Sequence, residues 1–315
     1  MPKQAFPALN FSKVRTYPAK KRRSKVRSSL LGRRTQKGAS FLSFIQGLPD
    51  ILAARNLKTI AHKIAAAHRD KRTVLLGMGA HPLKVGLSPL IIDFMERGII
   101  DAVALNGAGV IHDFELAFMG QTSEDVAASL EDGSFGMAEE TGSFINRAII
   151  EGSRQQLGVG VAVGRAIIDA RLPHRRLSIL AAGARLGIPV TAHIAIGTDI
   201  IHMHPQADGG AIGDGSLRDF RTFTSVVATL ARGVYLNVGS AVLLPEVFLK
   251  AVSLARNLGR SVQNLTTVDL DFLVHYRPLT NVVTRPTLQS GQGYHLTGHM
   301  EIMLPLLFGA VLEEL

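Results

Sequence analysis

Residues 73–105 read TVLLGMGAHPLKVGLSPLIIDFMERGIIDAVAL, and this stretch decides the expected fold. The apolar run at 73–77 is typical of a buried strand, and residues 83–97 place apolar side chains at helical spacing. Gly98 suits the left-handed position that ends a helix. Residues 101–105 then repeat the strand pattern. A strand, a helix and a strand within about thirty residues predict a βαβ unit with parallel strands and a right-handed crossover.

The same alternation continues along the chain. Further strands are expected at 188–192, 234–238 and 262–270. Helices are expected at 43–54, 57–69, 137–156, 161–170, 176–186, 216–232, 245–257 and 300–312. Thr122-Ser-Glu-Asp125 has the pattern of a capping box that opens one more helix. The sequence therefore predicts an α/β fold, a single Rossmann-like doubly wound domain with a mostly parallel sheet.

Composition excludes several classes of protein and site. The 315 residues include no Cys, which removes disulfides, thiolate metal sites and cysteine nucleophiles. No apolar run approaches the ~18–20 residues that span a bilayer. The N-terminus lacks the apolar core of a secretory signal, so we expect a cytoplasmic protein.

The net charge of +10 is concentrated at the N-terminus. Residues 1–38 hold 12 of the 35 Lys and Arg and no Asp or Glu, so residues 39–315 carry a net charge of −2. We therefore divide the chain into a basic tail, 1–38, and an α/β domain, 39–315. A solvated tail is one interpretation, and contact with nucleic acid or another anionic partner is the alternative.

Two glycine-rich loops follow the first two expected strands, where open parallel sheets bind ligands. They read GMGAHPLK at 77–84 and NGAGVIHDFE at 106–115. Glycine lets the backbone approach a phosphate or a nicotinamide, although tight turns alone would also account for these glycines. Each loop adds a histidine and a charged residue. The catalytic candidates are therefore His81, Lys84, His112 and Asp113.

A third loop, HIAIGTDIIHMHP at 193–205, carries a possible metal site. In a strand, His202 and His204 would face the same side, and His193 and Asp199 lie nearby in sequence. A His-x-His pair alone is not specific, so a loop that faces a ligand is the favoured interpretation. The motif Gly158-Val-Gly160-Val-Ala-Val-Gly164 follows no strand, which indicates close helix packing rather than dinucleotide binding.

The loops in this order resemble the deoxyhypusine synthase-like family over about residues 40–313. The resemblance rests on 76–86, 98–109 (GIIDAVALNGAG), 188–190 (IPV), 198–199 (TD), 237–240 (NVGS) and 304–307 (LPLL). Residues 106–113 with 120–125 are also similar to the NAD-dependent ornithine cyclodeaminase domain of cyanobacteria and archaea.

The resemblance implies a deoxyhypusine synthase-like fold that binds NAD, usually as a homotetramer with sites at dimer interfaces. Transferred position by position, the NAD contacts fall on Gly79, Ala80, His81, Asn106, Gly107, Ala108, Gly109, Asp199, Gly239, Ser240, Gly298 and His299. Members of the family remove a hydride from a carbon that bears an amine. Such a step needs a base near the amine and a carboxylate to hold its positive charge.

One departure separates this chain from the synthases. They hold the transferred group on a lysine in a Trp-Gly-Lys loop, whereas this chain has no Trp and its only Lys after Lys84 is Lys250. The corresponding loop, 284–291, reads TRPTLQSG. His112 also stands where the synthases carry a carboxylate, which argues against spermidine as the substrate.

The resulting prediction is an NAD-dependent enzyme that acts on a small amine or amino acid through hydride removal and an imine intermediate. His112 is the expected general base, because imidazole titrates near neutral pH, and a histidine that packs beneath its loop is the alternative. Lys84 would bind a carboxylate or, if desolvated, act as an amine nucleophile, and a plain surface lysine is the alternative. Two rival functions remain: a metal-dependent hydrolase built on His193, Asp199, His202 and His204, and a nucleotide-binding protein without catalysis.

Overall fold

The computed structural model describes residues 6–315 and contains one six-stranded sheet. The strands are β1 (Val74–Met78), β2 (Ala102–Asn106), β3 (Val190–His193), β4 (Val234–Val238), β5 (Leu265–Asp271) and β6 (Gly291–Thr297). They lie in the order β3-β2-β1-β4-β5-β6, and every neighbouring pair is parallel. The strand order reverses between β1 and β4. This is the expected doubly wound α/β architecture, and the reversal marks where such sheets bind ligands.

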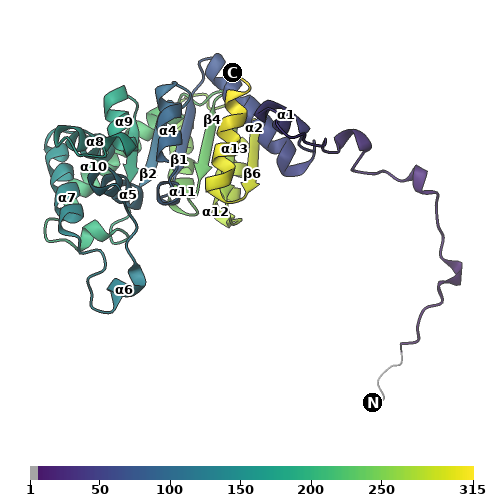
Figure 1. Ribbon diagram of the computed structural model, residues 1–315, viewed down its shortest axis with the longest axis horizontal. Coiled ribbons are helices and arrows are strands. Elements are labelled where there is room, and N and C mark those ends of the chain that lie inside the picture. The colour runs from purple at the N-terminus through teal and green to yellow at the C-terminus, as the bar shows by residue number, and fades with distance from the viewer. Residues whose placement is uncertain (1–5) are drawn as a thin grey trace.

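Helices cover both faces of the sheet (Figure 1). Their bounds are α1 (Phe41–Gly47), α2 (Leu52–Arg69), α3 (His81–Lys84), α4 (Ser88–Glu96), α5 (Gly107–Met119), α6 (Val126–Leu130), α7 (Glu139–Arg154), α8 (Val159–Asp169), α9 (Ile179–Leu186), α10 (Gly209–Val227), α11 (Leu243–Asn257), α12 (Tyr276–Pro278) and α13 (Met300–Leu312). Alternate strand residues enter two apolar clusters. Leu76 and Leu236 pack in the cluster that includes α4 and α13, and Leu75 and Tyr235 pack in the one beneath α11.

Helix α5, strand β6 and the short helix α12 were not expected from the sequence. Helix α5 begins inside a glycine-rich stretch that reads as a loop, and it forms because the Asn106 side chain accepts a hydrogen bond from Gly109 N at 2.9 Å. Strand β6 has only Leu296 fully buried and forms by pairing along β5. The expected strand at 262–270 is observed as β5, shifted toward the C-terminus.

The glycines of α8 confirm the predicted helix packing. A Cβ added to Gly160 would lie 1.8 Å from Val190 O in β3, and one added to Gly164 would lie 2.4 Å from Leu180 O in α9. Because any side chain would clash with these backbones, the glycines let α8 approach the sheet and its neighbouring helix. This motif therefore serves packing rather than a dinucleotide.

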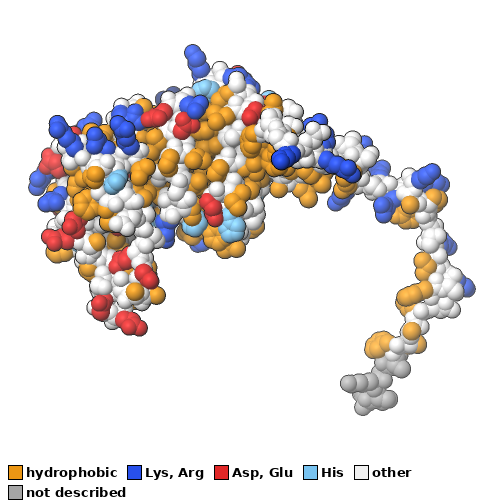
Figure 2. Space-filling model, in the orientation of Figure 1, with side chains coloured by type: hydrophobic (Ala, Val, Ile, Leu, Met, Phe, Trp, Pro, Cys, Tyr) orange, Lys and Arg blue, Asp and Glu red, His pale blue; other side chains and the backbone are white. Residues whose placement is uncertain are grey.

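Residues 6–40 lead away from the sheet as extended chain with three short 3₁₀ turns, at Phe11–Lys13, Ala19–Lys21 and Ser28–Leu30 (Figure 1). Basic side chains are distributed along this segment (Figure 2). Large apolar side chains are exposed on it as well, among them Phe6, Phe11 and Tyr17. Among the described residues, no helix is both long and apolar enough to cross a membrane.

Candidate functional site

The loops after β1 and β4 touch at the point where the strand order reverses. Gly79 N donates to Val238 O at 3.1 Å, and a Cβ added to Gly79 would lie 2.2 Å from Gly239 O. Gly239 adopts a φ of +62° and lies against Met300, which opens α13. Any side chain at position 79 would clash with the backbone at Gly239. Glycine is therefore required at position 79 for steric reasons.

A cavity of about 220 Å³ lies at the carboxyl end of β2. It is lined by Lys84 from α3, by α5, by the loop around α6, and by the loop after β3. The lining residues are Lys84, Ala108, Ile111, His112, Glu115, Ser123, Glu124, Val126, Phe135, Thr198, Asp199 and Ile200. Lys84, His112 and Asp199 therefore meet at one cavity although they come from separate segments of the chain, and Ala108 of the expected cofactor contacts lines it as well.

A hydrogen-bonded chain orients His112 in this cavity. The Thr122 hydroxyl donates to Glu115 Oε2 at 2.5 Å, so Thr122 Oγ1 must accept the proton of His112 Nδ1, which lies 2.6 Å away. This arrangement leaves the lone pair of His112 on Nε2. Thr141 also donates to Glu115, at 3.3 Å. These hydrogen bonds give His112 the tautomer that a general base needs.

Glu115 is the charged end of this chain. Burial alone would raise its pKa, but the nearby His112 ring and the hydrogen bonds from Thr122 and Thr141 outweigh burial and lower the pKa below its usual range. The carboxylate is therefore ionised at neutral pH. It lies 3.7 Å from His112 Nδ1, where its charge stabilises the imidazolium that forms when His112 takes up a proton.

Asp199 offers an unused acceptor beside the start of α5. Only 8% of the residue is exposed, and burial raises its pKa. Its Oδ2 atom has no hydrogen-bond partner within residues 6–315, and a Cβ added to Gly107 would lie 2.0 Å from that atom. Nearby, His202 Nδ1 accepts from Gly197 N at 3.1 Å, so its Nε2 carries the proton and is likewise buried without a partner. Such orphaned groups are typical of sites that complete their hydrogen bonds with a ligand.

Asp113 does not line the cavity. The residue is fully buried and caps α9, where it accepts from Ser178 Oγ at 2.5 Å and from Ile179 N at 2.7 Å. Burial raises the pKa of Asp113 to about 6 despite these hydrogen bonds. Successive residues of a helix diverge by about 100°, so α5 directs His112 to the cavity and Asp113 away from it. Its place in the structure is that of a helix cap.

His81 lies on the other side of the β1 loop. Its ring centroid is 5.6 Å from that of Phe272, which in turn stacks against His299 at 6.3 Å and an interplanar angle of 2°. The remaining residues of the expected cofactor set line the same edge of the sheet. Ala80 precedes α3, Ser240 Oγ accepts from Leu244 N at 3.2 Å, and Gly298 N donates to Asp271 O at 3.0 Å.

The histidines of the third loop do not converge on a metal. His193 Nε2 lies 3.1 Å from Thr191 Oγ1, and burial lowers the pKa of His193 to about 4. His204 Nε2 instead lies 2.8 Å from Gly136 O. Among residues 6–315, no group of three or more His, Asp or Glu side chains has the geometry to hold a metal ion. The metal-dependent hydrolase built on this loop is therefore not supported.

Two residues of the site were missed in the sequence. Thr122 was expected to open a helix through a capping box, but Asp125 caps α6 and Thr122 joins His112 to Glu115. Glu115 lies three residues after His112, the spacing that brings side chains together on a helix. That signal is readable only once 107–119 is recognised as helical.

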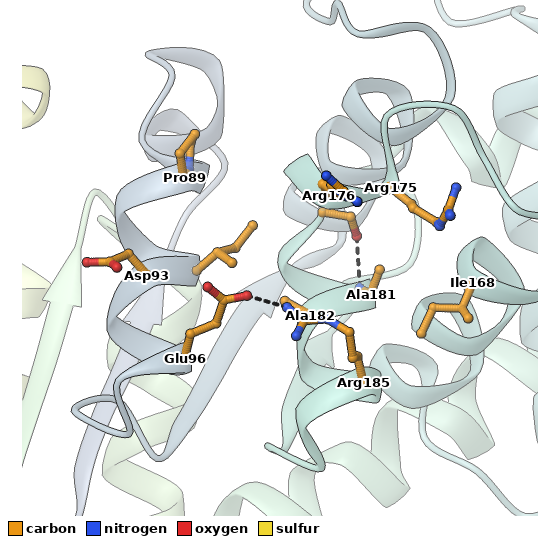
Figure 3. A pocket seen from close by; sticks show the side chains of 11 residues that line it. Pro89, Asp93, Glu96, Ile168, Arg175, Arg176, Ala181, Ala182 and Arg185 are labelled. Carbon is orange, nitrogen blue, oxygen red and sulfur yellow. Dashed lines mark hydrogen bonds and ion pairs between the residues drawn. The ribbon is translucent and has the colours of Figure 1, made fainter.

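A larger cavity of about 770 Å³ lies between α4 and α9, away from this edge (Figure 3). Glu96 and Arg185 form an ion pair across it at 2.5 Å. Arg176, Ala181 and Ala182 also line this cavity. No pair of groups there has the arrangement of a base and a substrate anchor, so we place the candidate site at the smaller cavity.

No protein-family model matches the sequence, and comparison with curated proteins gives no match. Solved structures do match. A Methanococcus maripaludis S2 protein described as LOR/SDH has a TM-score of 0.55 at 15% identity, over 93% of this chain and 75% of its own. AgrE in complex with ornithine and NAD⁺ has a TM-score of 0.54 at 12% identity over 84% of this chain. The chain spans about a third of the length of AgrE, 34%.

A protein from Entamoeba histolytica described as a deoxyhypusine synthase is also similar. Its TM-score is 0.50 at 12% identity, over 90% of this chain and 96% of its own. At these identities the comparisons establish the fold. The chain has the deoxyhypusine synthase-like fold, as the resemblance implied.

Proposed function

We propose that this chain is an NAD-dependent enzyme that removes a hydride from a small amine or amino acid and passes through an imine. The observation that carries the proposal is the cavity beside the switch point. It brings a base with a fixed tautomer, His112, together with an unpaired carboxylate oxygen of Asp199 and with the cation Lys84. Removal of the hydride needs a base near the amine and a carboxylate for its positive charge, and Lys84 adds a cation that can pair with an amino acid's carboxylate.

The residues around the switch point fit a dinucleotide. Gly79 lets the loop after β1 contact the loop after β4, and α5 begins at Gly107, directly after the carboxyl end of β2. In such folds the pyrophosphate lies against bare backbone and a helix N-terminus. We place the cofactor along Gly79–His81, Asn106–Gly109, Gly239–Ser240 and Gly298–His299, and Asp199 Oδ2 is free to accept from a ribose hydroxyl or an amine. Bound NAD would supply the hydride acceptor.

His112 is the proposed general base. Its Nε2 lone pair takes the proton of the substrate ammonium, so that the amine can become an imine once the hydride leaves. The proton already on Nδ1 remains bonded to Thr122 Oγ1. The charge of Glu115 then faces the imidazolium through Thr122, which stabilises the protonated base.

The charges in the cavity orient the substrate. Asp199 Oδ2 is the unused acceptor for the substrate's positive charge, since Glu115 already accepts from Thr122 and Thr141. Glu124 Oε2 accepts from Gly136 N at 2.9 Å and also lines the cavity. Lys84 is the one Lys or Arg among the lining residues and pairs with the carboxylate of an amino acid.

The absent carrier lysine limits the reaction. Lys250 lies on α11, where it forms an ion pair with Glu246. The stretch that corresponds to the carrier loop, 284–291, contains the short helical segment Arg285–Thr287 and ends where β6 begins. Deoxyhypusine synthesis by way of a lysine in that loop is therefore not part of this proposal. The imine would meet water or a second amine instead.

Titration of the purified protein into NADH, followed by the cofactor's fluorescence, tests the cofactor. Because the chain has no Trp, the protein background is low. Saturable enhancement that NAD⁺ displaces is expected, and small amines and amino acids are then screened for reduction of NAD⁺. A flat titration with cofactor-free protein contradicts the proposal.

Replacement of His112 tests the base. His112→Gln should retain NADH binding and lose turnover by about 10²–10⁴-fold, the usual contribution of a general base. His62→Gln is the matched control, because His62 is exposed and pairs with Glu314 at 3.1 Å. Turnover by His112→Gln at the rate of the control would exclude His112 as the base. Light scattering on the same samples tests the homotetramer that the resemblance implies.

A further inference from the structure

A second polar chain crosses the opposite half of the sheet. Asn237 in β4, Asp269 in β5 and His295 in β6 occupy paired positions on three adjacent strands. Paired residues of parallel strands leave the sheet on the same face, so the three side chains form one row. Thr297 lies two residues after His295 on β6 and therefore shares that face. The row ends at the carboxyl edge of the sheet.

The hydrogen bonds of this row have one consistent direction. Asn237 Nδ2 donates to Asp269 Oδ1 at 2.7 Å, which leaves Oδ2 to accept from His295 Nδ1 at 2.8 Å. With its proton on Nδ1, His295 has its lone pair on Nε2. Thr297 Oγ1 lies 2.9 Å from that atom, so the hydroxyl donates to it. A hydroxyl, a base and an orienting carboxylate in this order are the arrangement that activates a nucleophile.

The side chains of the row become more exposed from Asp269 to Thr297, which a nucleophile with a shielded carboxylate requires. Asp269 is fully buried, the His295 side chain is 17% exposed, and Thr297 is exposed. The carboxylate is thus shielded from water while the hydroxyl is accessible to a substrate. Thr297 also stands three residues before Met300, where α13 begins. The first amides of a helix have no intrahelical partner. In α13, Ile302 N already donates to His299 O at 3.1 Å, so Met300 N and Glu301 N are the amides that remain for a developing oxyanion.

We propose that Thr297 is the nucleophile of an acyl-transfer site for small activated esters, with His295 as its base and Asp269 as the positioning residue. Thr297 Oγ1 attacks the acyl carbon and forms an ester bond, and its proton passes to His295 Nε2. His295 then gives that proton to the departing alkoxide. Water, deprotonated by His295, releases the acid and restores the threonine. The net reaction is hydrolysis of an ester, and no redox partner takes part.

This site is distinct from the cavity around His112. The Asn237–Thr297 row uses β4, β5 and β6, whereas the cavity is built from α3, α5 and the loops after β2 and β3. None of the residues that line the cavity belongs to the row. Thr297 nevertheless adjoins Gly298 and His299, which the proposed function assigns to the cofactor, so the ester assay uses cofactor-free protein. Release of p-nitrophenolate and reduction of NAD⁺ are measured separately, so the failure of one proposal is distinguishable from the failure of the other.

Reaction of the full chain with p-nitrophenyl acetate tests the proposal. We expect a burst of p-nitrophenolate close to one equivalent of protein, together with a gain of one acetyl group that peptide mapping assigns to Thr297. Thr297→Val should abolish both, and Thr297→Ser should retain both. His295→Gln should slow the burst by about 10²–10⁴-fold. Thermal unfolding of each variant verifies that it is folded.

Thr59→Val is the matched control. Thr59 is half-buried, and its hydroxyl donates to Arg55 O at 2.9 Å within α2 rather than to a histidine. The control should acetylate like the unaltered chain. The proposal is overturned if no burst occurs, if the acetyl group maps to another residue, or if Thr297→Val acetylates at the rate of the control.

Discussion

Replacing Gly79 with alanine tests directly whether the switch point depends on bare backbone. The added Cβ would lie 2.2 Å from Gly239 O, whereas ordinary contacts of a Cβ begin near 3.4 Å. The loops after β1 and β4 must therefore separate by about 1 Å. Neither atom belongs to a flexible side chain that could turn away. The strain must be absorbed by the backbone itself, including the hydrogen bond from Gly79 N to Val238 O.

The expected effect is large in both stability and ligand binding. Overpacking a dense interior costs about 1–3 kcal/mol, and contact between two backbones places Gly79→Ala near the upper end of that range. The fold should survive, because domains are stable by about 5–15 kcal/mol. The Kd for NADH should rise more than about tenfold, which corresponds to roughly 1.4 kcal/mol, because the altered loops are those proposed to hold the cofactor.

Urea unfolding and the NADH titration on the same samples measure both effects. Gly213→Ala is the matched control, because a Cβ on Gly213 of α10 meets nothing within 4 Å. Alanine within a helix should raise its free energy of unfolding by about 0.5–1 kcal/mol and leave NADH binding unchanged. If Gly79→Ala unfolds and binds like the unaltered chain, the close approach of β1 and β4 is not required and the steric argument fails.

Three further perturbations follow from the same contacts. Gly107→Ala should displace the Asp199 carboxylate, since the new Cβ would lie 2.0 Å from Oδ2, and weaken ligand binding with little loss of stability in urea. Thr122→Val should lower kcat for amine oxidation at least about tenfold with KM nearly unchanged, because His112 loses its orienting partner. Burial raises the pKa of Asp219 to about 7, against about 3.9 when unfolded. The contribution of Asp219 to the free energy of unfolding is thus fully present below about pH 4 and is lost as the pH rises through about 7, by up to roughly 4 kcal/mol. Urea unfolding at several pH values measures this dependence, and Asp219→Asn should make the free energy of unfolding less dependent on pH.

The part of the fold that the sequence predicted is the part that local patterns determine. Residues 74–105 form β1, α4 and β2 because an apolar run, a helical spacing and a terminal glycine agree with one another. Strand β6 lacks such a pattern: it begins with Gly291, and its partner β5 supplies the hydrogen bonds that hold it. An edge strand defined by pairing leaves little trace in its own sequence.

The site was predicted only in part for a related reason. Lys84 and His112 were found because each follows a parallel strand, and parallel strands end at the same edge. Asp113 was placed beside His112 because 106–115 was taken for a loop, in which neighbours can share a site. In the helix that actually forms, the partner on the same face is three residues on, which is Glu115. One secondary-structure assignment thus decided which carboxylate was chosen.

The charge around the cavity restricts the class of substrate more sharply than any single residue. Residues 98–146, which form much of its lining, contain nine Asp and Glu and no Lys or Arg. Lys84 offers one positive charge against Asp199, Glu115 and Glu124, so the lining favours a ligand with more positive than negative groups. A diamine or a basic amino acid meets this condition, and a dicarboxylate does not. In competition experiments, linear diamines should therefore slow oxidation of the preferred amine, whereas dicarboxylates of equal length should leave it unchanged, and the reverse result would contradict the assignment of Asp199 to the substrate's positive charge.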